Sequence, residues 1–388
     1  MEQTFIVYSA NEQDIDWLRA ALMPHQLLAA DKTTEEILSL CDATGASVIF
    51  VGMDTENMTR KCNLIESLLA IRPLLTIVGM GDGLDNELII NAMRAGARDF
   101  IVYGMRSNEV MGLVHRITQR APAVPVKPAK KHTTLIYGAQ ASPDAALASV
   151  MLAMGLQQQG KRVLLIDLGS PVAEAQEILG MEPGFTFQDA LRNLKRLDSN
   201  LIESAFPRHQ SGICLLSNGL ADAGFHETGA TDHYLLQSAL SQHFDQVIVN
   251  LAGQPDSEQL RSLASMSAHI YWYTNQCMSC CKRNLEVLRH WRQIGINLEH
   301  ARLLVDHYVS QVAPDKQDMS ATFGLPLLTA IATDPVNRLK VKNAGLPYRG
   351  RAEGSLARAY RPLVKHILSH VSGPAHKHWL KRLTEAFS

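Results

Sequence analysis

The segment Gly138–Leu147 is the clearest place in this 388-residue chain for phosphate chemistry, because a loop there follows an apolar strand and opens a helix. A phosphate cradle needs consecutive backbone N–H groups, glycines for close approach, a lysine and a hydroxyl that binds Mg²⁺. Pro143 removes one N–H donor, and Asp144 puts a carboxylate at the helix start. Ser142 suits the N-cap and Pro143 the first helical position. The segment therefore predicts a well-formed helix start without phosphate chemistry.

One cysteine cluster and one group of three histidines are the next candidates for a metal site. The cysteine cluster, Cys277–Cys281, lacks the second pair that a zinc site usually needs. His226, His233 and His243 lie near one another at spacings that match no ligand pattern. The sequence therefore predicts reduced thiols, ordinary histidines and no metal site.

The first 120 residues alternate short apolar runs with helical patterns, which is typical of a parallel sheet covered on both faces. The expected helices include Asp14–Leu22 and Asn86–Arg94. The expected strands are Phe5–Tyr8, Ser47–Val51, Leu75–Val78 and Phe100–Val102. This order predicts right-handed crossovers and an open, doubly wound sheet.

That layout, with Gly96–Val102 leading into Asn108–Val110, resembles the receiver domain of response regulators. The resemblance implies an acidic cluster after the first strand, a phosphoacceptor aspartate after the third and a lysine after the last. Such groups hold Mg²⁺ and the phosphoryl oxygens during phosphoryl transfer.

The present sequence departs from the receiver pattern at each of these positions. Tyr8 and Ser9 stand at the end of the first strand, Gly52 ends the third, and Tyr103 takes the lysine position. Asp54 is acidic but two residues late. We expect a receiver-shaped domain that is not phosphorylated.

A stretch with three prolines and three lysines at residues 121–131 predicts a solvated linker. It separates expected domains at residues 1–120 and 132–372, and a tail follows at residues 373–388. After the linker, the strand–loop–helix–strand unit Thr133–Asp167 resembles the MinD/ParA branch of P-loop ATPases. The predicted fold class is α/β with two doubly wound parallel sheets, the first receiver-like or flavodoxin-like and the second of the P-loop MinD/ParA type.

The resemblance assigns a position to each group that ATP chemistry needs. The family loop reads lysine, two glycines, any residue, glycine, lysine and two hydroxyl residues. Here the lysine positions hold Gln140 and Ala145. The glycine positions hold Ala141, Ser142 and Asp144, and the hydroxyl positions hold Ala146 and Leu147.

The family's metal-binding strand resembles Phe244–Asn250, which ends in Asn250 where the family has an aspartate; Asp167 is retained. We therefore expect no bound ATP, no cofactor, no metal and no catalytic residue. The degenerate loop comprises Gly138, Gln140, Ser142, Pro143, Asp144 and Ala145, with Asn250 on the neighbouring strand.

Two later segments, Ile331–Val336 and Lys342–Pro347, also match this family. Together with the receiver-like first domain, they make the chain resemble the TadZ/CpaE proteins that place tight-adherence (Flp) pilus machinery. The resemblance covers nearly all of residues 1–372 and implies a localisation factor, often dimeric. Gln140 replaces the lysine that reaches across an ATP-bound dimer, so we expect a homodimer that does not depend on ATP.

The end of the chain predicts a basic amphipathic helix. Its apolar side chains fall in one arc of about 120° and include Trp379, Leu380, Leu383 and Phe387. Its basic side chains outside that arc are Lys377, Lys381 and Arg382. Such a helix suits an anionic membrane surface, but its apolar face suits its own domain or a partner helix equally well. Both alternatives stay open.

Composition excludes several classes of protein. A content of 46% hydrophobic and 19% charged residues predicts a folded globular chain, and a net charge of −1 gives no field for nucleic acid. No apolar run approaches the about 20 residues of a spanning helix, and the N-terminus lacks the basic region of a secretion signal. We expect a cytoplasmic protein, with peripheral placement at the inner membrane or cell pole as the alternative.

These observations predict a non-enzymatic localisation hub for pilus machinery. It would dimerise and dock the pilus-assembly ATPase and polar or inner-membrane components. The alternative is an ATP-switched MinD/ParA-type ATPase with a non-standard loop. Action on DNA would need a helix-turn-helix or a basic stripe, and the sequence has neither, so we expect no nucleic-acid partner.

Overall fold

The computed structural model describes residues 3–30, 33–83, 85–120, 132–182, 184–194, 197, 199–218, 230–344 and 354–371. The chain forms two compact units, one of residues 1–130 with 228–238 and the other of residues 131–227 with 239–388. The expected linker at 121–131, the tail helix from Lys377 to Phe387 and His226 lie outside the described residues.

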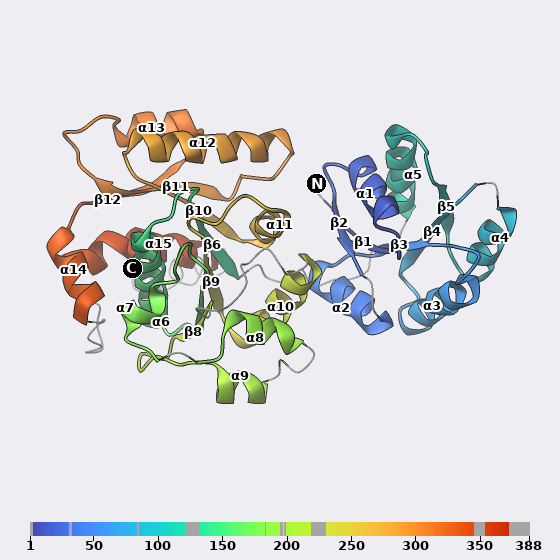
Figure 1. Ribbon diagram of the computed structural model, residues 1–388, viewed down its shortest axis with the longest axis horizontal. Coiled ribbons are helices and arrows are strands. Elements are labelled where there is room, and N and C mark those ends of the chain that lie inside the picture. Colours follow the sequence, from blue (N-terminus) through green and yellow to red (C-terminus); the bar gives the residue numbers. More distant parts are fainter. Residues whose placement is uncertain are drawn as a thin grey trace, which may run out of the picture. The chain divides into compact units, whose positions relative to one another are not determined.

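The first unit contains a five-stranded parallel sheet in the order β2-β1-β3-β4-β5 (Figure 1). Its strands are β1 (Thr4–Tyr8), β2 (Gln26–Ala29), β3 (Val48–Gly52), β4 (Thr76–Gly81) and β5 (Asp99–Val102). Its helices are α1 (Glu12–Ala21), α2 (Thr34–Thr44), α3 (Met58–Ile71), α4 (Asn86–Arg94) and α5 (Ser107–Arg120).

Helices cover both faces of this first sheet. Apolar residues of α1 and α5 pack around Phe5 and Phe50 on one face, whereas α2, α3 and α4 contact β1, β3 and β4 from the other. The doubly wound prediction is confirmed, and so are the four predicted strands. Strand β2 was not predicted, because its buried apolar part is only Leu27 and Leu28 at the edge of the sheet.

The second unit contains a seven-stranded sheet in the order β12-β11-β10-β6-β9-β7-β8, and all its neighbouring strands are parallel. The strands are β6 (Thr133–Tyr137), β7 (Val163–Asp167), β8 (Cys214–Ser217), β9 (Gln246–Asn250), β10 (His269–Thr274), β11 (Ala301–Tyr308) and β12 (Leu327–Ala332). The fold class predicted for both sheets is confirmed.

The helices that follow α5 in the chain begin with the helix after the loop. They are α6 (Pro143–Gln157), α7 (Ala175–Leu179), α8 (Phe187–Arg192), α9 (Ser199–Ala205), α10 (Ala230–His243), α11 (Glu258–Met266), α12 (Met278–Gln293), α13 (Lys316–Phe323), α14 (Pro335–Ala344) and α15 (Ser355–Val371). Within the described residues, no helix has the length and apolar character needed to cross a membrane.

Two layers pack on the second sheet and fix its carboxyl edge. Helix α6 is rich in alanine, leucine and methionine, which favour helix, and it is buried on nearly every side between the strands and α15. On the opposite face, Trp291 of α12 stacks on Tyr137 with ring centroids 5.6 Å apart and meets Trp272 edge-on. These aromatic contacts hold α12 against β6 and β10, and the loop Gly138–Ser142 follows the end of β6.

Candidate functional site

The loop Gly138–Ser142 joins β6 to α6 at the carboxyl edge of the second sheet, where the sequence predicts it. Gly138 is required there, because an added Cβ would lie 2.5 Å from the carbonyl oxygen of Tyr273. The backbone N–H of Ala139 donates to Oδ1 of the buried Asn284 at 3.0 Å. One N–H of the loop is therefore already bonded to a protein group.

The start of α6 agrees with the prediction in its backbone. Ser142 has the extended conformation of an N-cap, Pro143 is the first helical residue and Asp144 lies in the first turn. The Ser142 side chain makes no capping bond, and its hydroxyl instead lies 3.3 Å from the Tyr273 hydroxyl. Gln140, at a lysine position of the related loops, is exposed to solvent.

Three basic side chains surround the Asp144 carboxylate. Its oxygens lie 2.7 Å from Nε2 of His307, 3.1 Å from Nζ of Lys342 and 3.3 Å from Nη1 of Arg338. Burial alone would raise the pKa of Asp144. The His307 hydrogen bond and the charges of Lys342 and Arg338 outweigh burial and hold that pKa well below its usual range.

A second carboxylate, that of Asp306, also pairs with Arg338. Asp306 is fully buried and Arg338 is 3% exposed. Arg338 donates through Nη1 to Oδ2 of Asp306 at 2.9 Å, and its Nη2 pairs with Oδ1. The Tyr273 hydroxyl donates to Asp306 Oδ2 at 2.7 Å, which completes a network of Tyr273, Asp306, Arg338 and Asp144. We call this set, with His307 and Lys342, the Asp144 network.

Local sequence explains how these residues meet. Asp334 accepts a hydrogen bond from the Asn337 N–H at 3.3 Å, and Pro335 is the first residue of α14. Four-residue spacing then puts Arg338 and Lys342 on one face of α14. The sequence analysis did not name Arg338, and it named Lys342 only as the first residue of a segment that matches the family. An Asp-Pro helix start followed by two cations four residues apart is the signal that could have found both.

His307 reaches Asp144 from a strained backbone. Its φ is 50°, at a point where the pairing of β11 with β12 loses regular register. A non-glycine residue adopts this conformation at a cost, and such residues are concentrated where the surrounding structure fixes a side chain. Here the fixed contact is the bond between His307 and Asp144.

Asn250 and Asp167 end the adjacent strands β9 and β7 and pair directly in register. Nδ2 of Asn250 donates to Asp167 Oδ1 at 2.7 Å, and Asn250 Oδ1 accepts from the Ala252 N–H at 3.2 Å. The Ala175 N–H donates to the other Asp167 oxygen at 2.7 Å. Burial raises the pKa of Asp167 against the effect of these donors. Both side chains are bonded to protein groups.

The alanines at the second lysine position and first hydroxyl position face the interior. Ala145 is fully buried and Ala146 is 2% exposed, and both belong to the apolar core that α6 forms with the sheet. The loop itself therefore has no cationic or hydroxyl side chain at these two positions.

The carboxyl edge of the first sheet brings together the residues predicted at its receiver positions. A Cβ on Gly52 would lie 2.8 Å from Ser9 Oγ and 3.4 Å from the Tyr103 hydroxyl. Burial and the nearby Asp14 carboxylate raise the pKa of Tyr103. Oδ1 of Asp54 accepts the Asn57 N–H at 2.6 Å, so this carboxylate stabilises a turn.

Lys61 of α3 is a residue that the sequence analysis did not name at this edge. It is 5% exposed, and its ammonium lies 4.4 Å from the centre of the Tyr8 ring. Burial lowers the pKa of Lys61 against the opposing charge of Asp54. The ammonium group of Lys61 therefore faces the aromatic ring of Tyr8. In the receiver pattern, acidic residues stand at the end of this first strand.

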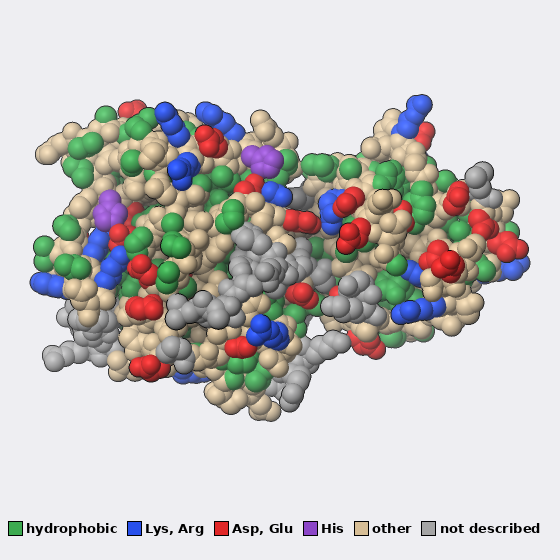
Figure 2. Space-filling view, viewed as in Figure 1, with side chains coloured by type: hydrophobic (Ala, Val, Ile, Leu, Met, Phe, Trp, Pro, Cys, Tyr) green, Lys and Arg blue, Asp and Glu red, His purple; other side chains and the backbone are tan. Residues whose placement is uncertain are grey.

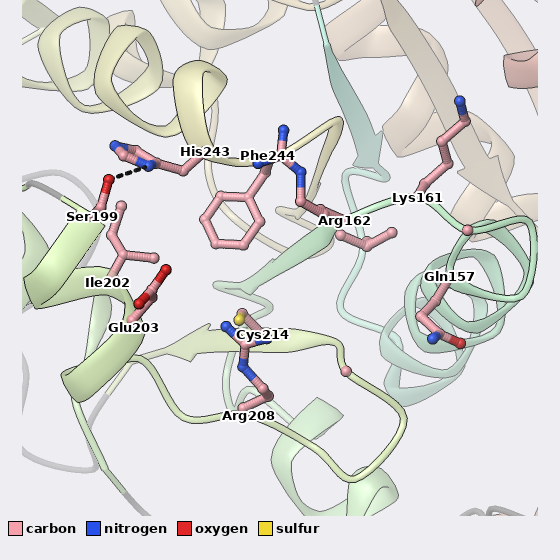
Figure 3. Close-up of a pocket in the computed structure, with 13 residues that line it drawn as sticks. Gln157, Lys161, Arg162, Ser199, Ile202, Glu203, Arg208, Cys214, His243 and Phe244 are labelled. Atoms are coloured by element: carbon pink, nitrogen blue, oxygen red, sulfur yellow. Dashed lines mark hydrogen bonds between the residues drawn. The ribbon is translucent and has the colours of Figure 1, made fainter.

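A separate pocket of about 430 Å³ opens at the amino edge of the second sheet. Figure 3 shows its lining, which includes Lys161, Arg162, Glu203, Arg208 and His243. Arg162 also pairs with the Asp245 carboxylate at 3.0 Å. This pocket lies at the strand ends opposite the loop, and the sequence analysis did not predict it.

The second unit is similar in structure to known ATPases. The solved structure of a ParA family ATPase from Chlorobium tepidum TLS shares 14% sequence identity with this chain and has a TM-score of 0.54. The match covers 62% of this chain and 98% of the ATPase chain. The match shows the ParA-type fold. The MinD cell division protein of Aquifex aeolicus is 15% identical, covers 61% of this chain and 97% of its own, and has a TM-score of 0.49. No curated protein matches the chain.

The first unit gives the more specific matches. A CheY-like protein (TadZ) from Pseudomonas aeruginosa PAO1 is 42% identical and covers 32% of this chain and 100% of its own, with a TM-score of 0.30. Residues 1–131 match the family model described as the N-terminal part of pilus assembly protein TadZ. This match and the 42% sequence identity to the Pseudomonas aeruginosa protein show that the chain belongs to the TadZ family of pilus assembly proteins.

Proposed function

We propose that this protein is a non-enzymatic localisation and assembly hub for tight-adherence pilus machinery, with a ParA-type domain that neither binds nor hydrolyses ATP and a receiver-type domain that is not phosphorylated. One observation carries the proposal. The Asp144 network fills the start of α6 with the protein's own anion and pairs the neighbouring cations with it. A triphosphate there would meet a carboxylate whose charge the network maintains.

The carboxyl edge of the second sheet offers a surface for docking instead. Large apolar side chains, each more than half exposed, follow the ends of four strands in sequence. They are Val172 after β7, Met278 after β10, Val312 after β11, and Val336 and Leu339 after β12. Figure 2 shows hydrophobic and basic side chains together on the surface around α14. Apolar side chains grouped at one edge are typical of a protein interface.

The occupant that we propose for this edge is a second copy of the chain. A dimer formed by apolar contacts at the carboxyl edge needs no ATP between its subunits. Further docking partners would be the pilus-assembly ATPase and polar or inner-membrane components.

Calorimetric titration of the intact chain with Mg-ATP tests the pseudo-ATPase. We expect no saturable heat up to millimolar nucleotide and no phosphate release above the buffer rate. Saturable binding at micromolar ATP with slow turnover would support the alternative, an ATP-switched ATPase. That alternative has one observation in its favour, since Lys342, Arg338 and His307 would face a phosphate if Asp144 turned away.

Asp144→Gly together with Ala145→Lys and Ala146→Thr restores the residues of the related loops and serves as the comparison protein in that titration. Ala145 and Ala146 are buried, so circular dichroism must first establish that this variant folds. Asp144→Gly alone keeps the core intact and provides a second comparison.

Light scattering after size exclusion tests the dimer. We expect twice the chain mass without nucleotide, and we expect Leu339→Glu to halve it. Leu74→Glu, at a leucine that is 46% exposed in the first unit, is the matched control and leaves the mass unchanged. A monomer at every concentration would reject the proposed dimer.

The tail gives a separate test of membrane placement. Deleting residues 375–388 should release the protein from membranes without changing its unfolding midpoint, because the basic amphipathic helix that the sequence predicts there would supply the anchor. Unchanged sedimentation with membranes would exclude that anchor and favour docking of the tail on protein.

A further inference from the structure

Three histidines, two from one helix and one from a strand almost 100 residues earlier in the chain, meet at the amino edge of the second sheet. His269 is the first residue of β10 and is buried, whereas His366 and His370 lie in the last turns of α15. One ring nitrogen from each lies within 4.8 Å of one from both others. The three ring centres are 4.7 to 5.0 Å apart in every pairing. We call these residues the histidine trio.

We propose that the histidine trio is a binding site for a divalent transition metal, with Zn²⁺ as the metal to be tested first. Imidazole nitrogen is a preferred ligand of Zn²⁺, Ni²⁺, Cu²⁺ and Co²⁺. Two histidines four residues apart on a helix can bind one ion together. The site does not depend on the function proposed above, because it lies at the opposite edge of the sheet from the loop.

Hydrogen bonds orient both helix histidines for this role. Nδ1 of His370 lies 2.8 Å from the carbonyl oxygen of His366, so it must carry the proton that it donates. Nε2 of His370 then keeps its lone pair, as a metal ligand must.

Tyr271 orients His366 in the same sense. Its hydroxyl donates to the carbonyl oxygen of Leu363 at 3.3 Å and lies 3.1 Å from Nδ1 of His366. When the hydroxyl proton is used in the bond to Leu363, the hydroxyl oxygen accepts the proton of Nδ1, and Nε2 of His366 keeps its lone pair. Outer groups of this kind fix the tautomer and ring direction of metal-binding histidines.

The charge state of the trio also suits a metal. Burial and the neighbouring histidines lower the pKa of His269 to about 3, and burial, His370 and Arg302 lower the pKa of His366 to about 4. Arg302 opposes a cation here, but its guanidinium donates to the carbonyl oxygens of Glu299 and Ala301.

The distances require a small adjustment when the metal binds. Nitrogen ligands at about 2.0–2.1 Å from a tetrahedral Zn²⁺ lie about 3.3 Å from one another. His370 is exposed at the end of α15 and His366 is half-buried, so their side chains can close the difference. Three protein ligands leave a fourth position for water or another group.

Cobalt titration of the untagged full chain, stripped of metal with a chelator, tests the site. We expect one Co²⁺ per chain with visible d–d absorption of a low-coordinate site, and its displacement by one equivalent of Zn²⁺. His370→Ala is the variant of choice, because its exposed side chain contributes little to folding. We expect it to weaken binding about 100-fold, and Tyr271→Phe to weaken it about tenfold.

His300→Ala is the matched control, since His300 is an exposed neighbour of the trio and should leave the affinity unchanged. The chain has 15 histidines, so the site of binding matters as much as binding itself. Absence of saturable Co²⁺ or Zn²⁺ binding overturns the proposal. Binding that survives His366→Ala combined with His370→Ala also overturns it, because the metal then lies elsewhere.

Discussion

The two edges of the second sheet differ in what their polar side chains bind. At the carboxyl edge, Asp144, Asp306 and Arg338 are bonded to one another. At the amino edge, Arg162 pairs with Asp245 in solvent, and the histidine trio brings one ring nitrogen of each residue within 4.8 Å of the others. Sheets of this class bind ligands at the carboxyl edge. The difference teaches that the polar side chains at the carboxyl edge pair with one another, whereas the histidines that we propose as metal ligands lie at the amino edge.

Removing the central arginine of the carboxyl edge is expected to have the largest effect. Arg338→Ala leaves the fully buried Asp306 without its cation, which should lower the free energy of unfolding by about 3–5 kcal/mol. Urea unfolding of both proteins at pH 7 gives the value.

The amino edge supplies the matched control for that variant. In the Arg162–Asp245 pair the side chains are 63% and 39% exposed, so Arg162→Ala should cost less than about 1 kcal/mol. Equal losses of unfolding free energy in the two variants would contradict this comparison. The ion pair of Arg338 would then stabilise the fold no more than an ordinary surface ion pair does.

Lowering the pH below about 3.9 should weaken the ion pairs of Asp144 with its basic neighbours. The pKa of Asp144 is lower in the folded chain than in the unfolded chain, so the carboxylate stabilises the fold above the unfolded value of about 3.9. We expect Asp144→Asn to cost about 1.5–3 kcal/mol at pH 7. Below about pH 3.9 that difference should shrink by about 1.4 kcal/mol per pH unit, as wild-type Asp144 loses its advantage.

Asp318→Asn is the control for this series, since Asp318 also lies in the first turn of a helix, α13, but is exposed. Its unfolding free energy should differ little from that of the wild type at either pH. A constant Asp144→Asn difference between pH 7 and pH 2.5 would contradict the ion-paired state of Asp144.

The smallest expected change in unfolding free energy concerns the N-cap residue of α6. Ser142 makes no capping bond, whereas Ser257 at the start of α11 accepts the Leu260 N–H at 3.2 Å. Ser257→Ala should therefore cost about 1 kcal/mol, and Ser142→Ala less than about 0.5 kcal/mol. The reverse order in urea unfolding would mean that capping, and not the Asp144 network, holds this helix start.

Much of the fold could be predicted from local sequence. Apolar runs such as Val48–Val51 and Val247–Val249 identify strands that are buried on both faces, because such strands have apolar side chains on consecutive residues. The Ser-Pro-Asp start of α6 is equally local. Strand β2 was missed because an edge strand with two buried leucines lacks that continuous pattern.

The partners of the site residues could not be predicted in the same way. His307 and Lys342 reach Asp144 across more than 160 residues of chain, from a strained strand position and from a later helix. The sequence of the loop fixes neither contact. The histidine trio has the same property, since His269 meets α15 only after the sheet has formed.

The burial of α6 has a consequence for how this chain can change over generations. A lysine at position 145 puts a charge into a closed core, and a glycine at position 144 removes the carboxylate that pairs with Lys342 and, together with Asp306, with Arg338. Each step back toward a triphosphate-binding loop is harmful unless the others accompany it. Under the function proposed above, this coupling favours further change of the sequence without a return to nucleotide binding.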